Sequence, residues 1–446
     1  MSSPIRFCRV TLADRERFEQ IVHSSECRNC DMSFANIFCW QDSYHSMAAQ
    51  LQGWLLIRFT TDDNQTAYMQ PVGSGDEIAA LEALAADAAL LGTPLRLFGL
   101  DEHWKGIVER YCGDKVAFHA SPSHADYIYL SKDLATLPGR KYQPKRNFIN
   151  RFTSRYSYDF KAITADNLED CLYLNRIWCD QKGVKSTDPE QLALRRAFDN
   201  FLSLNLRGWI LYADSTPAAF AMGSEINHDT FCIHIEKCDA IFEGASAMIN
   251  NLVATELTEQ YRYINREDDL GLEGLRRAKQ SYYPTMMLTK HSALQLTAAE
   301  ADMRQLWHDT FGDDIATIDH FFIRLYNPER CFTHSINNRT VAMLHIVPIV
   351  ENGEQNGYIY AVSTAPEFRR QGIAGNIIHR AIDSVQKGGI YNHLLLIPAN
   401  EQLVSFYKKF GFEPTGELFT QPQNITEYDL GSGNGGQDFV MRRKIL

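Results

Sequence analysis

The chain has 446 residues, too many for one hydrophobic core, and this length predicts two to three domains. Hydrophobic residues make up 45% and charged residues 22%, a globular composition that excludes a disordered chain. The net charge of −11 argues against a general nucleic-acid coat, although it leaves room for a local basic patch.

The cysteines and the first residues indicate the compartment. Ten cysteines are scattered without a dense framework, and the opening residues contain no apolar signal core, so we expect a reduced, cytoplasmic protein. No apolar run is long enough to cross a bilayer, so no transmembrane segment is expected. Cys27 and Cys30 lack a second, correctly spaced pair, and we therefore expect no metal.

Strand-like runs alternate with amphipathic helical patterns along the whole chain, which predicts an α/β protein with mixed sheets. In the first third we expect strands at 54–59, 95–100 and 126–130, and helices at 76–91 and 101–111. In the second third we expect helices at 167–182, 189–204 and 244–261, and strands at 209–213, 218–225 and 230–237.

Between these two thirds lies a basic stretch, residues 139–155, with six positive charges and no acid. A stretch of this kind is either a phosphate-binding surface or a solvated helix face, and the sequence leaves both open. Its cations are Arg140, Lys141, Lys145, Arg146, Arg151 and Arg155.

The last third repeats the same order of elements. Helices are expected at 298–311, 315–326, 372–386 and 400–410, and strands at 331–336, 341–350, 358–364, 393–397 and 439–443. The glycine-rich run 431–436 lacks a strand and helix around it and is predicted to be a loop.

An internal repeat underlies this order. Residues 209–222 and 332–345 each form a strand, a polar turn and a strand of small residues, followed by a further strand and a glycine-led helix. We count two clear copies and a weaker one, and predict domains at 1–137, 138–294 and 295–446.

The strongest chemical signal lies where the strand at 358–364 leads into the helix at 372–386. The helix begins Gly372-Ile-Ala-Gly, and Arg369 and Arg370 precede it. A helix start leaves N–H groups unpaired and carries partial positive charge, and small residues let an anion approach them. This arrangement suits a pyrophosphate.

The pattern Arg369-x-x-Gly372-x-Ala374 resembles the acyl-CoA signature of the GNAT N-acetyltransferase family, and the resemblance covers about residues 297–446. It implies acetyl-CoA as acyl donor and direct attack by an amine on a thioester, held by backbone N–H groups at a bulge of the strand at 358–364. The implied donor contacts are Val362, Ser363, Thr364, Arg369, Arg370, Gln371, Gly372, Ile373, Ala374, Gly375 and Asn400.

The helix at 400–410 carries a second element of that family. The resemblance places Tyr407 near the CoA sulfur, where its hydroxyl protonates the departing thiolate. The alternative is one more buried aromatic residue on an amphipathic helix. The general base stays unassigned, because neither Glu354 nor Glu367 is convincing, and a water relaying to His345 or to the solvent is equally plausible.

The second copy lacks the signature. When Gly244 is aligned with Gly372, Glu243 falls where a pyrophosphate would sit, and we expect no ordinary CoA binding there. The basic segment from Arg140 to Arg155, residues 218–223 and residues 274–284 together resemble the soluble C-terminal domain of phosphatidylglycerol lysyltransferases, over about 1–294.

That second resemblance implies paired GNAT-like folds, and so three GNAT-like units in all, with an aminoacyl-tRNA donor for the pair. Arg276, Arg277 and Lys279 would then add to the phosphate contacts of the basic stretch. The carboxylate-rich residues 265–269 are either a positioning network for a substrate amine or an internal ion-pair cluster.

Three hypotheses follow. The first is an N-acetyltransferase that acts on a small-molecule or peptide amine. The second is aminoacyl transfer from charged tRNA to a lipid or peptide acceptor by the N-terminal pair. In the third, the pair is a module that binds the substrate. The sequence leaves the acceptor and the oligomeric state open.

Overall fold

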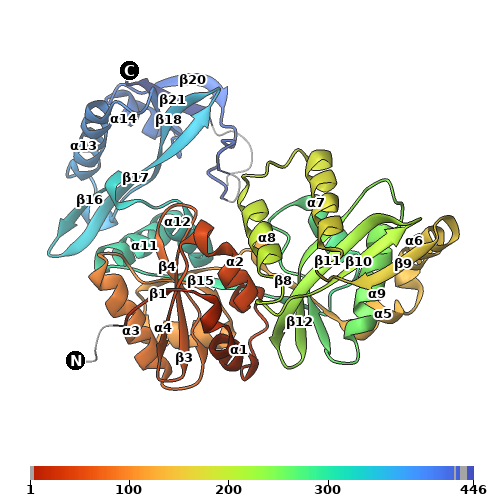
Figure 1. The fold of residues 1–446 in the computed structure, drawn as a ribbon. Coiled ribbons are helices and arrows are strands. Elements are labelled where there is room, and N and C mark those ends of the chain that lie inside the picture. Colours follow the sequence, from red (N-terminus) through yellow and green to blue (C-terminus); the bar gives the residue numbers. More distant parts are fainter. Residues whose placement is uncertain (1–4, 426–427, 432–438) are drawn as a thin grey trace. The chain divides into compact units, whose positions relative to one another are not determined.

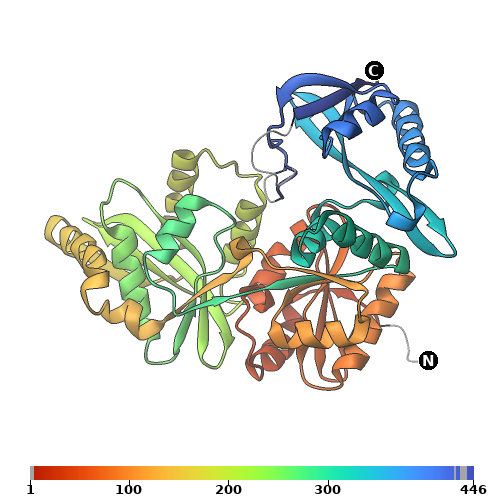
Figure 2. The ribbon, with the colours of Figure 1, turned by 180° about the vertical axis from the view of Figure 1, so that it is seen from behind.

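The computed structural model describes residues 5–425, 428–431 and 439–446, so most of the glycine-rich run 431–436 lies outside the described residues. The chain forms two compact units, Met1–Tyr111 with Ala120–Ser292, and Cys112–His119 with Ala293–Leu446. Three mixed sheets with helices packed on them confirm the predicted α/β class (Figures 1 and 2). Within the described ranges, no helix has the length and apolarity needed to cross a membrane.

The first unit begins with a sheet whose strands follow the order β1-β2-β3-β4-β6, with β5 paired to β3. The strands are β1 (Cys8–Arg9), β2 (Met47–Leu51), β3 (Trp54–Thr60), β4 (Thr66–Met69), β5 (Val72–Gly73) and β6 (Arg96–Leu100). The helices are α1 (Arg15–His23), α2 (Phe34–Tyr44), α3 (Glu77–Leu90) and α4 (Glu102–Cys112). Helix α1 was not predicted, because only Phe18 and Val22 of this helix are buried and its apolar periodicity is weak.

The second sheet of this unit has the order β14-β8-β13-β12-β11-β10-β9. Its strands are β8 (Asp126–Leu130), β9 (Tyr158–Ala162), β10 (Arg207–Ala213), β11 (Thr216–Asn227), β12 (Thr230–Cys238), β13 (Tyr263–Asn265) and β14 (Met286–Leu288). Its helices are α5 (Ser131–Thr136), α6 (Gln143–Arg155), α7 (Leu168–Lys182), α8 (Pro189–Asp199), α9 (Ala245–Leu257) and α10 (Glu273–Gln280).

Alternating side chains of β10 show how this second sheet is covered. Trp209 and Leu211 share a core with α5, α6 and α9, whereas Ile210 lies in a core with α7, α8, α1 and α2. Strand β8 precedes the expected domain boundary at 137 and belongs to this sheet. The domain boundaries themselves stay predictions.

The second unit contains the third sheet, with the order β16-β17-β18-β19-β21-β20. Its strands are β16 (Cys331–Ile336), β17 (Arg339–Glu351), β18 (Glu354–Thr364), β19 (His393–Leu396), β20 (Glu413–Leu418) and β21 (Phe439–Lys444). Helices α13 (Ile373–Gly388) and α14 (Glu401–Lys408) pack on one face, and α11 (Ala298–Phe311) and α12 (Ile315–Arg324) on the other. The chain passes between the units in β7 (Val116–His119) and β15 (His291–Gln295).

The second and third sheets share one detail that confirms the internal repeat. In β12, His234 is an extra residue between the pairs Gly223–Ile233 and Met222–Ile235, and in β18 Ala361 and Val362 oppose a single residue of β17. Each strand therefore contains a β-bulge. Each bulge precedes a helix whose N-cap is a glycine with positive φ, Gly244 at 94° and Gly372 at 79°.

Candidate functional site

The candidate acyl-donor site lies where β18 and β19 separate. The two strands pair in parallel only at Gly357–Leu394 and Tyr358–Leu395, although β18 runs on to Thr364. The bulge at Ala361 and Val362, where Ala361 has φ 50°, follows directly. Beyond Tyr358, the edge of β18 has no β19 partner among the described residues, so its backbone groups can bind an extended ligand.

The N-terminus of α13 lies at the end of the same strand. The first backbone bond into the helix runs from Asn376 N to Gly372 O at 3.0 Å, so the N–H groups of residues 373–375 have no partner within the helix. A Cβ built on Gly372 would lie more than 4 Å from its neighbours in the described part of the chain. Open space therefore faces N–H groups that favour an anion.

The turn between β18 and α13 is held by the predicted contact residues themselves. Arg369 Nε donates to the carbonyl of Thr364 at 2.9 Å, and the Gln371 amide donates to the carbonyl of Glu367 at 3.3 Å. The buried hydroxyls of Ser363 and Thr364 find no hydrogen-bond partner within the described residues. An unpaired buried hydroxyl costs about 1–3 kcal/mol. The open helix start fits the diphosphate of CoA.

Tyr407 comes from α14, which follows β19. The helix begins at Asn400, whose side-chain oxygen accepts a hydrogen bond from Leu403 N at 3.1 Å. Tyr407 is 6% exposed and packs against Phe406 and Phe412. Burial raises the pKa of Tyr407 to about 12. The phenol therefore keeps its proton at neutral pH, as a general acid must.

The groups considered as general bases are placed unfavourably. His345 is 2% exposed, its ring lies 5.0 Å from Phe321 and 5.9 Å from Trp307, and burial lowers its pKa from 6.5 to about 3. An imidazole with this pKa is a poor proton acceptor, which disfavours the relay to His345. Glu367 pairs with Arg339 at 3.0 Å, and Glu354 lies 3.6 Å from His393.

His345 also gives a prediction for stability. Its folded pKa is depressed, so its contribution is fully present above pH 6.5 and is lost as pH falls toward 3. As the pH is lowered through this range, the free energy of unfolding should fall more steeply because of His345, by up to about 1.4 kcal/mol per pH unit. Denaturant unfolding at several pH values, with wild type and His345→Phe, measures this. An equally steep acid loss in both proteins would contradict it.

The corresponding position of the second sheet is closed. A Cβ on Gly244 would lie 2.4 Å from the carbonyl oxygen of Phe148 in α6, which therefore packs directly on the start of α9. Glu243 pairs with Arg151 and Arg155, each at 2.5 Å. The anion position is thus filled by a helix and an ion-pair cluster, which supports the expectation that this copy does not bind CoA in the ordinary way.

The basic residues of the first unit are placed in different surroundings. The Lys145 ammonium lies 3.8 Å from the centre of the Tyr282 ring, and burial lowers its pKa to about 8. Arg146 donates to Gly139 O at 2.8 Å and also to Leu137 O. Arg140 and Lys141 are exposed, with Lys141 4.9 Å from the centre of the Tyr283 ring. Phosphate contacts by these residues stay a prediction.

The three downstream cations also differ. Arg276 pairs with the carboxylate of Asp269 at 2.9 Å, and Arg277 is exposed, 3.7 Å from Glu273. Lys279 is buried, and its ammonium donates to the carbonyl of Arg266 at 2.6 Å and to that of Asp268. The Lys279 ammonium thus holds a loop in place through these two carbonyls and is turned away from an external phosphate, whereas Arg277 remains available for a phosphate contact.

A buried ion-pair cluster joins the two sheets of the first unit. Lys290 lies 2.8 Å from Asp126 and 2.9 Å from Asp31, and Asp126 also accepts from Asn265 and from Cys30 N, each at 2.9 Å. Burial alone would raise the pKa of Asp126, but Lys290 and these donors outweigh it and hold the pKa below its usual value. Asn265 of the carboxylate-rich residues 265–269 therefore has a structural role.

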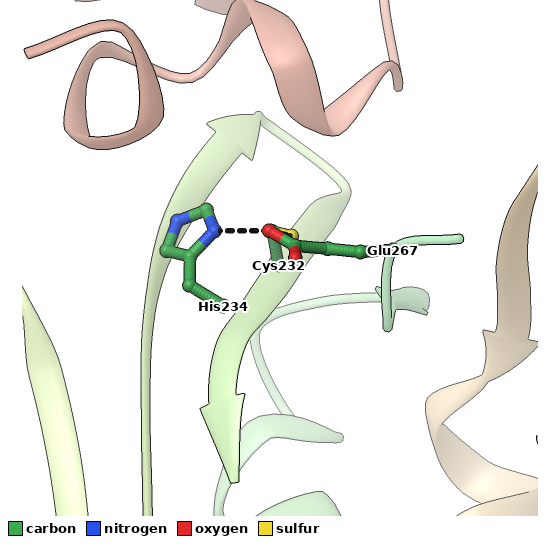
Figure 3. A group of neighbouring side chains, drawn as sticks. All are labelled: Cys232, His234 and Glu267. Carbon is green, nitrogen blue, oxygen red and sulfur yellow. Dashed lines mark hydrogen bonds and ion pairs between the residues drawn. The ribbon is translucent and has the colours of Figure 1, made fainter. Parts of the chain in front are cut away.

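Glu267, from the same stretch, has different neighbours (Figure 3). Its Oε1 lies 2.9 Å from His234 Nδ1 and 3.9 Å from Cys232 Sγ, and one donor atom of each of the three residues lies within 4.8 Å of the others. These are atom types that bind metals, so the expected absence of metal stays a prediction. His234 and Cys232 were not among the residues expected from the sequence, although they lie two residues apart on one strand.

Comparison with known proteins identifies both parts of the chain. Residues 23–293 match the family described as phosphatidylglycerol lysyltransferase, C-terminal, and residues 297–412 match the acetyltransferase (GNAT) family. A conserved protein of unknown function from Bacteroides thetaiotaomicron has a crystal structure that is 41% identical, with a TM-score of 0.63, covering 65% of this chain and 99% of that one.

Two further relatives are more distant. The structure of L-PGS from Bacillus licheniformis is 14% identical, with a TM-score of 0.50, over 63% of this chain and 92% of that one, which supports the fold alone. The uncharacterized protein MYCGA3080 of Mycoplasmoides gallisepticum is 26% identical over 204 residues, 44% of this chain. The match spans 62% of the length of that curated relative.

These matches confirm the two resemblances found in the sequence. The chain belongs to the phosphatidylglycerol lysyltransferase C-terminal family, and a GNAT acetyltransferase domain follows that part.

Proposed function

We propose that the C-terminal GNAT domain is an acyl-CoA-dependent N-acyltransferase, with acetyl-CoA as donor and a primary amine as acceptor. The observation that carries this proposal is the open start of α13 at Gly372, at the end of the β18 edge that β19 leaves unpaired within the described residues. The donor's diphosphate binds the N–H groups of residues 373–375, and its thioester carbonyl lies at the bulge of β18.

The acyl transfer is direct. The lone pair of a neutral amine attacks the thioester carbon, and the carbon–sulfur bond breaks. The thiolate takes a proton from the Tyr407 hydroxyl, the ammonium formed on the acceptor loses its proton to water, and the solvent returns a proton to the Tyr407 phenolate. All ten cysteines lie in the described ranges, and all are free thiols, as expected for the cytoplasmic location that we propose.

An acetyl-transfer screen with the full chain tests this function. Acetyl-CoA is offered with amines, amino acids, polyamines and peptides, and release of free CoA thiol is followed. We expect turnover with at least one class of primary amine. The proposal would be wrong if acetyl-CoA did not raise the melting temperature of the chain and did not transfer its acetyl group to any amine.

Tyr407→Phe separates catalysis from binding. The variant keeps the packing of the ring but removes the acidic hydroxyl, so kcat should fall by roughly a hundredfold or more while the affinity for CoA stays near wild type. Tyr391→Phe is the matched control, because Tyr391 is buried in the same core. Unchanged kcat in Tyr407→Phe would remove the acid role from this residue.

A second function, aminoacyl transfer from charged tRNA to a lipid or peptide acceptor, is proposed for the first unit. The family match over residues 23–293 favours it. Charge reversal at the exposed cations Arg140, Lys141 and Arg277 should weaken tRNA binding and reduce its salt dependence. Gel shifts at modest salt measure this, and absence of retardation by wild type would leave only the substrate-binding module.

A further inference from the structure

Ser224, His234 and Glu267 form a hydrogen-bonded chain in the first unit. Ser224 Oγ on β11 lies 2.8 Å from His234 Nε2 on β12, and His234 Nδ1 lies 2.9 Å from Glu267 Oε1, just after β13. The Ser224 residue and the His234 side chain are each 7% exposed, and the Glu267 side chain is 28% exposed. The three side chains are thus largely shielded from water, but Glu267, at one end of the hydrogen-bonded series, reaches solvent.

The bonds define the direction of proton transfer. A carboxylate only accepts hydrogen bonds, so His234 Nδ1–H donates to Glu267. In the neutral imidazole, Nε2 is then the acceptor, and the Ser224 hydroxyl donates to it. Both ring nitrogens are occupied, so the proton that His234 can take in this arrangement is that of Ser224. A nucleophile, a base and a group that orients the base follow one another at hydrogen-bond distance.

Glu267 is fixed from two further sides. Asn36 Nδ2 of α2 donates to the same Oε1 at 3.0 Å, and the backbone N–H of Glu267 donates to Asn265 Oδ1 at 2.7 Å. Its φ of 58° is unfavourable for a residue with a side chain. Such conformations persist where the surroundings fix them, and they cluster at functional sites.

The three hydrogen-bonded side chains lie at the bulge of β12. His234 is the extra residue there, and the strand, buried up to Ile233, becomes half-buried from His234 to Glu236. In the GNAT domain of the same chain, the bulge of β18 takes the equivalent place before the glycine-capped helix. The second sheet therefore carries a nucleophile and a base where the third sheet carries its proposed acyl-binding backbone.

We propose that Ser224, His234 and Glu267 form a second acyl-transfer centre, which works through a covalent acyl-serine. The donor is an activated ester, such as an aminoacyl ester. Ser224 Oγ bonds to the ester carbonyl carbon as its proton passes to His234 Nε2. The ester carbon–oxygen bond then breaks, and His234 returns the proton to the leaving alcohol. An acceptor amine or hydroxyl afterwards attacks the acyl-serine while His234 Nε2 takes the acceptor's proton; the bond to Ser224 Oγ breaks, and His234 returns that proton to Ser224.

A fluorophosphonate probe tests this centre in the full chain, with neither CoA nor tRNA present, so the outcome is independent of the proposed functions. The probe forms a stable ester with an activated serine and releases fluoride. Intact-mass measurement should show one adduct per chain, and peptide mapping should place it on Ser224. A p-nitrophenyl ester should release a burst of one p-nitrophenolate per chain and leave its acyl group on the same residue.

Variants make the test specific. Ser224→Ala should remove the adduct, and His234→Gln should slow its formation by about a hundredfold or more. Ser246→Ala is the control, because the exposed Ser246 bonds to Glu236, at 3.3 Å, and not to His234, and should therefore label like wild type. An unlabelled wild type, or an adduct mapped to another residue, would overturn the proposal. So would a metal ion that survives dialysis and is lost in His234→Gln.

Discussion

Replacing Gly372 with glutamate should abolish CoA binding by the full chain. The new side chain would enter the open space at the helix start, beside the N–H groups of residues 373–375, and bring a negative charge to the place proposed for the diphosphate. Titration calorimetry should show at least about a hundredfold loss of affinity, and the rise in melting temperature caused by acetyl-CoA should disappear.

Gly389→Glu is a closely matched control for this variant. Gly389 caps the other end of α13, has φ 59°, and has open space around its Cβ position within the described structure. Both variants therefore add the same charge and the same backbone strain to the same helix. They differ in which end of α13 carries the new side chain. Equal loss of CoA affinity in both would show that the fold of the helix, and not the helix start, was at fault.

Lys290→Met should destabilise the first unit by about 3–5 kcal/mol, because Asp126 would be left buried without its cation. Asp126 is 0% exposed and lies 2.8 Å from the Lys290 ammonium. Denaturant unfolding followed by tryptophan fluorescence measures the loss. The methionine side chain has nearly the same length, so the lost packing is small beside the lost charge pairing.

The double variant Asp126→Asn, Lys290→Met identifies the cause of this loss. Removing both charges eliminates the unpaired carboxylate, so the double variant should be more stable than the sum of the two single changes predicts. Additive losses would mean that the two groups do not depend on each other. Unchanged stability in Lys290→Met would show that Asp126 is protonated or hydrated in the folded chain.

Local sequence predicted the parts of the structure that are themselves local. The strand, the turn and the glycine-led helix from residue 358 to 386 occur as expected, because alternation, capping and a helix start are encoded in neighbouring residues. The repeat was predictable for the same reason, since Gly244 and Gly372 cap equivalent helices.

Contacts between distant residues were not predictable in this way. Ser224 and His234 are separated by a turn, and Glu267 follows 33 residues after His234, so their hydrogen bonds depend on the order of strands in the folded sheet. The basic stretch shows the same limit. Its composition gave the charge, but the pairing of Arg151 with Glu243, 92 residues away, depends on where α6 packs.

The proposed acyl-CoA site depends most on the start of α13, and a crystal structure of the full chain with acetyl-CoA tests this site most directly. The diphosphate should lie within hydrogen-bond distance of the N–H groups of residues 373–375, with the thioester at the bulge formed by Ala361 and Val362. A donor bound elsewhere on the chain, with these N–H groups facing solvent or a side chain, would contradict the proposed acyl-CoA site.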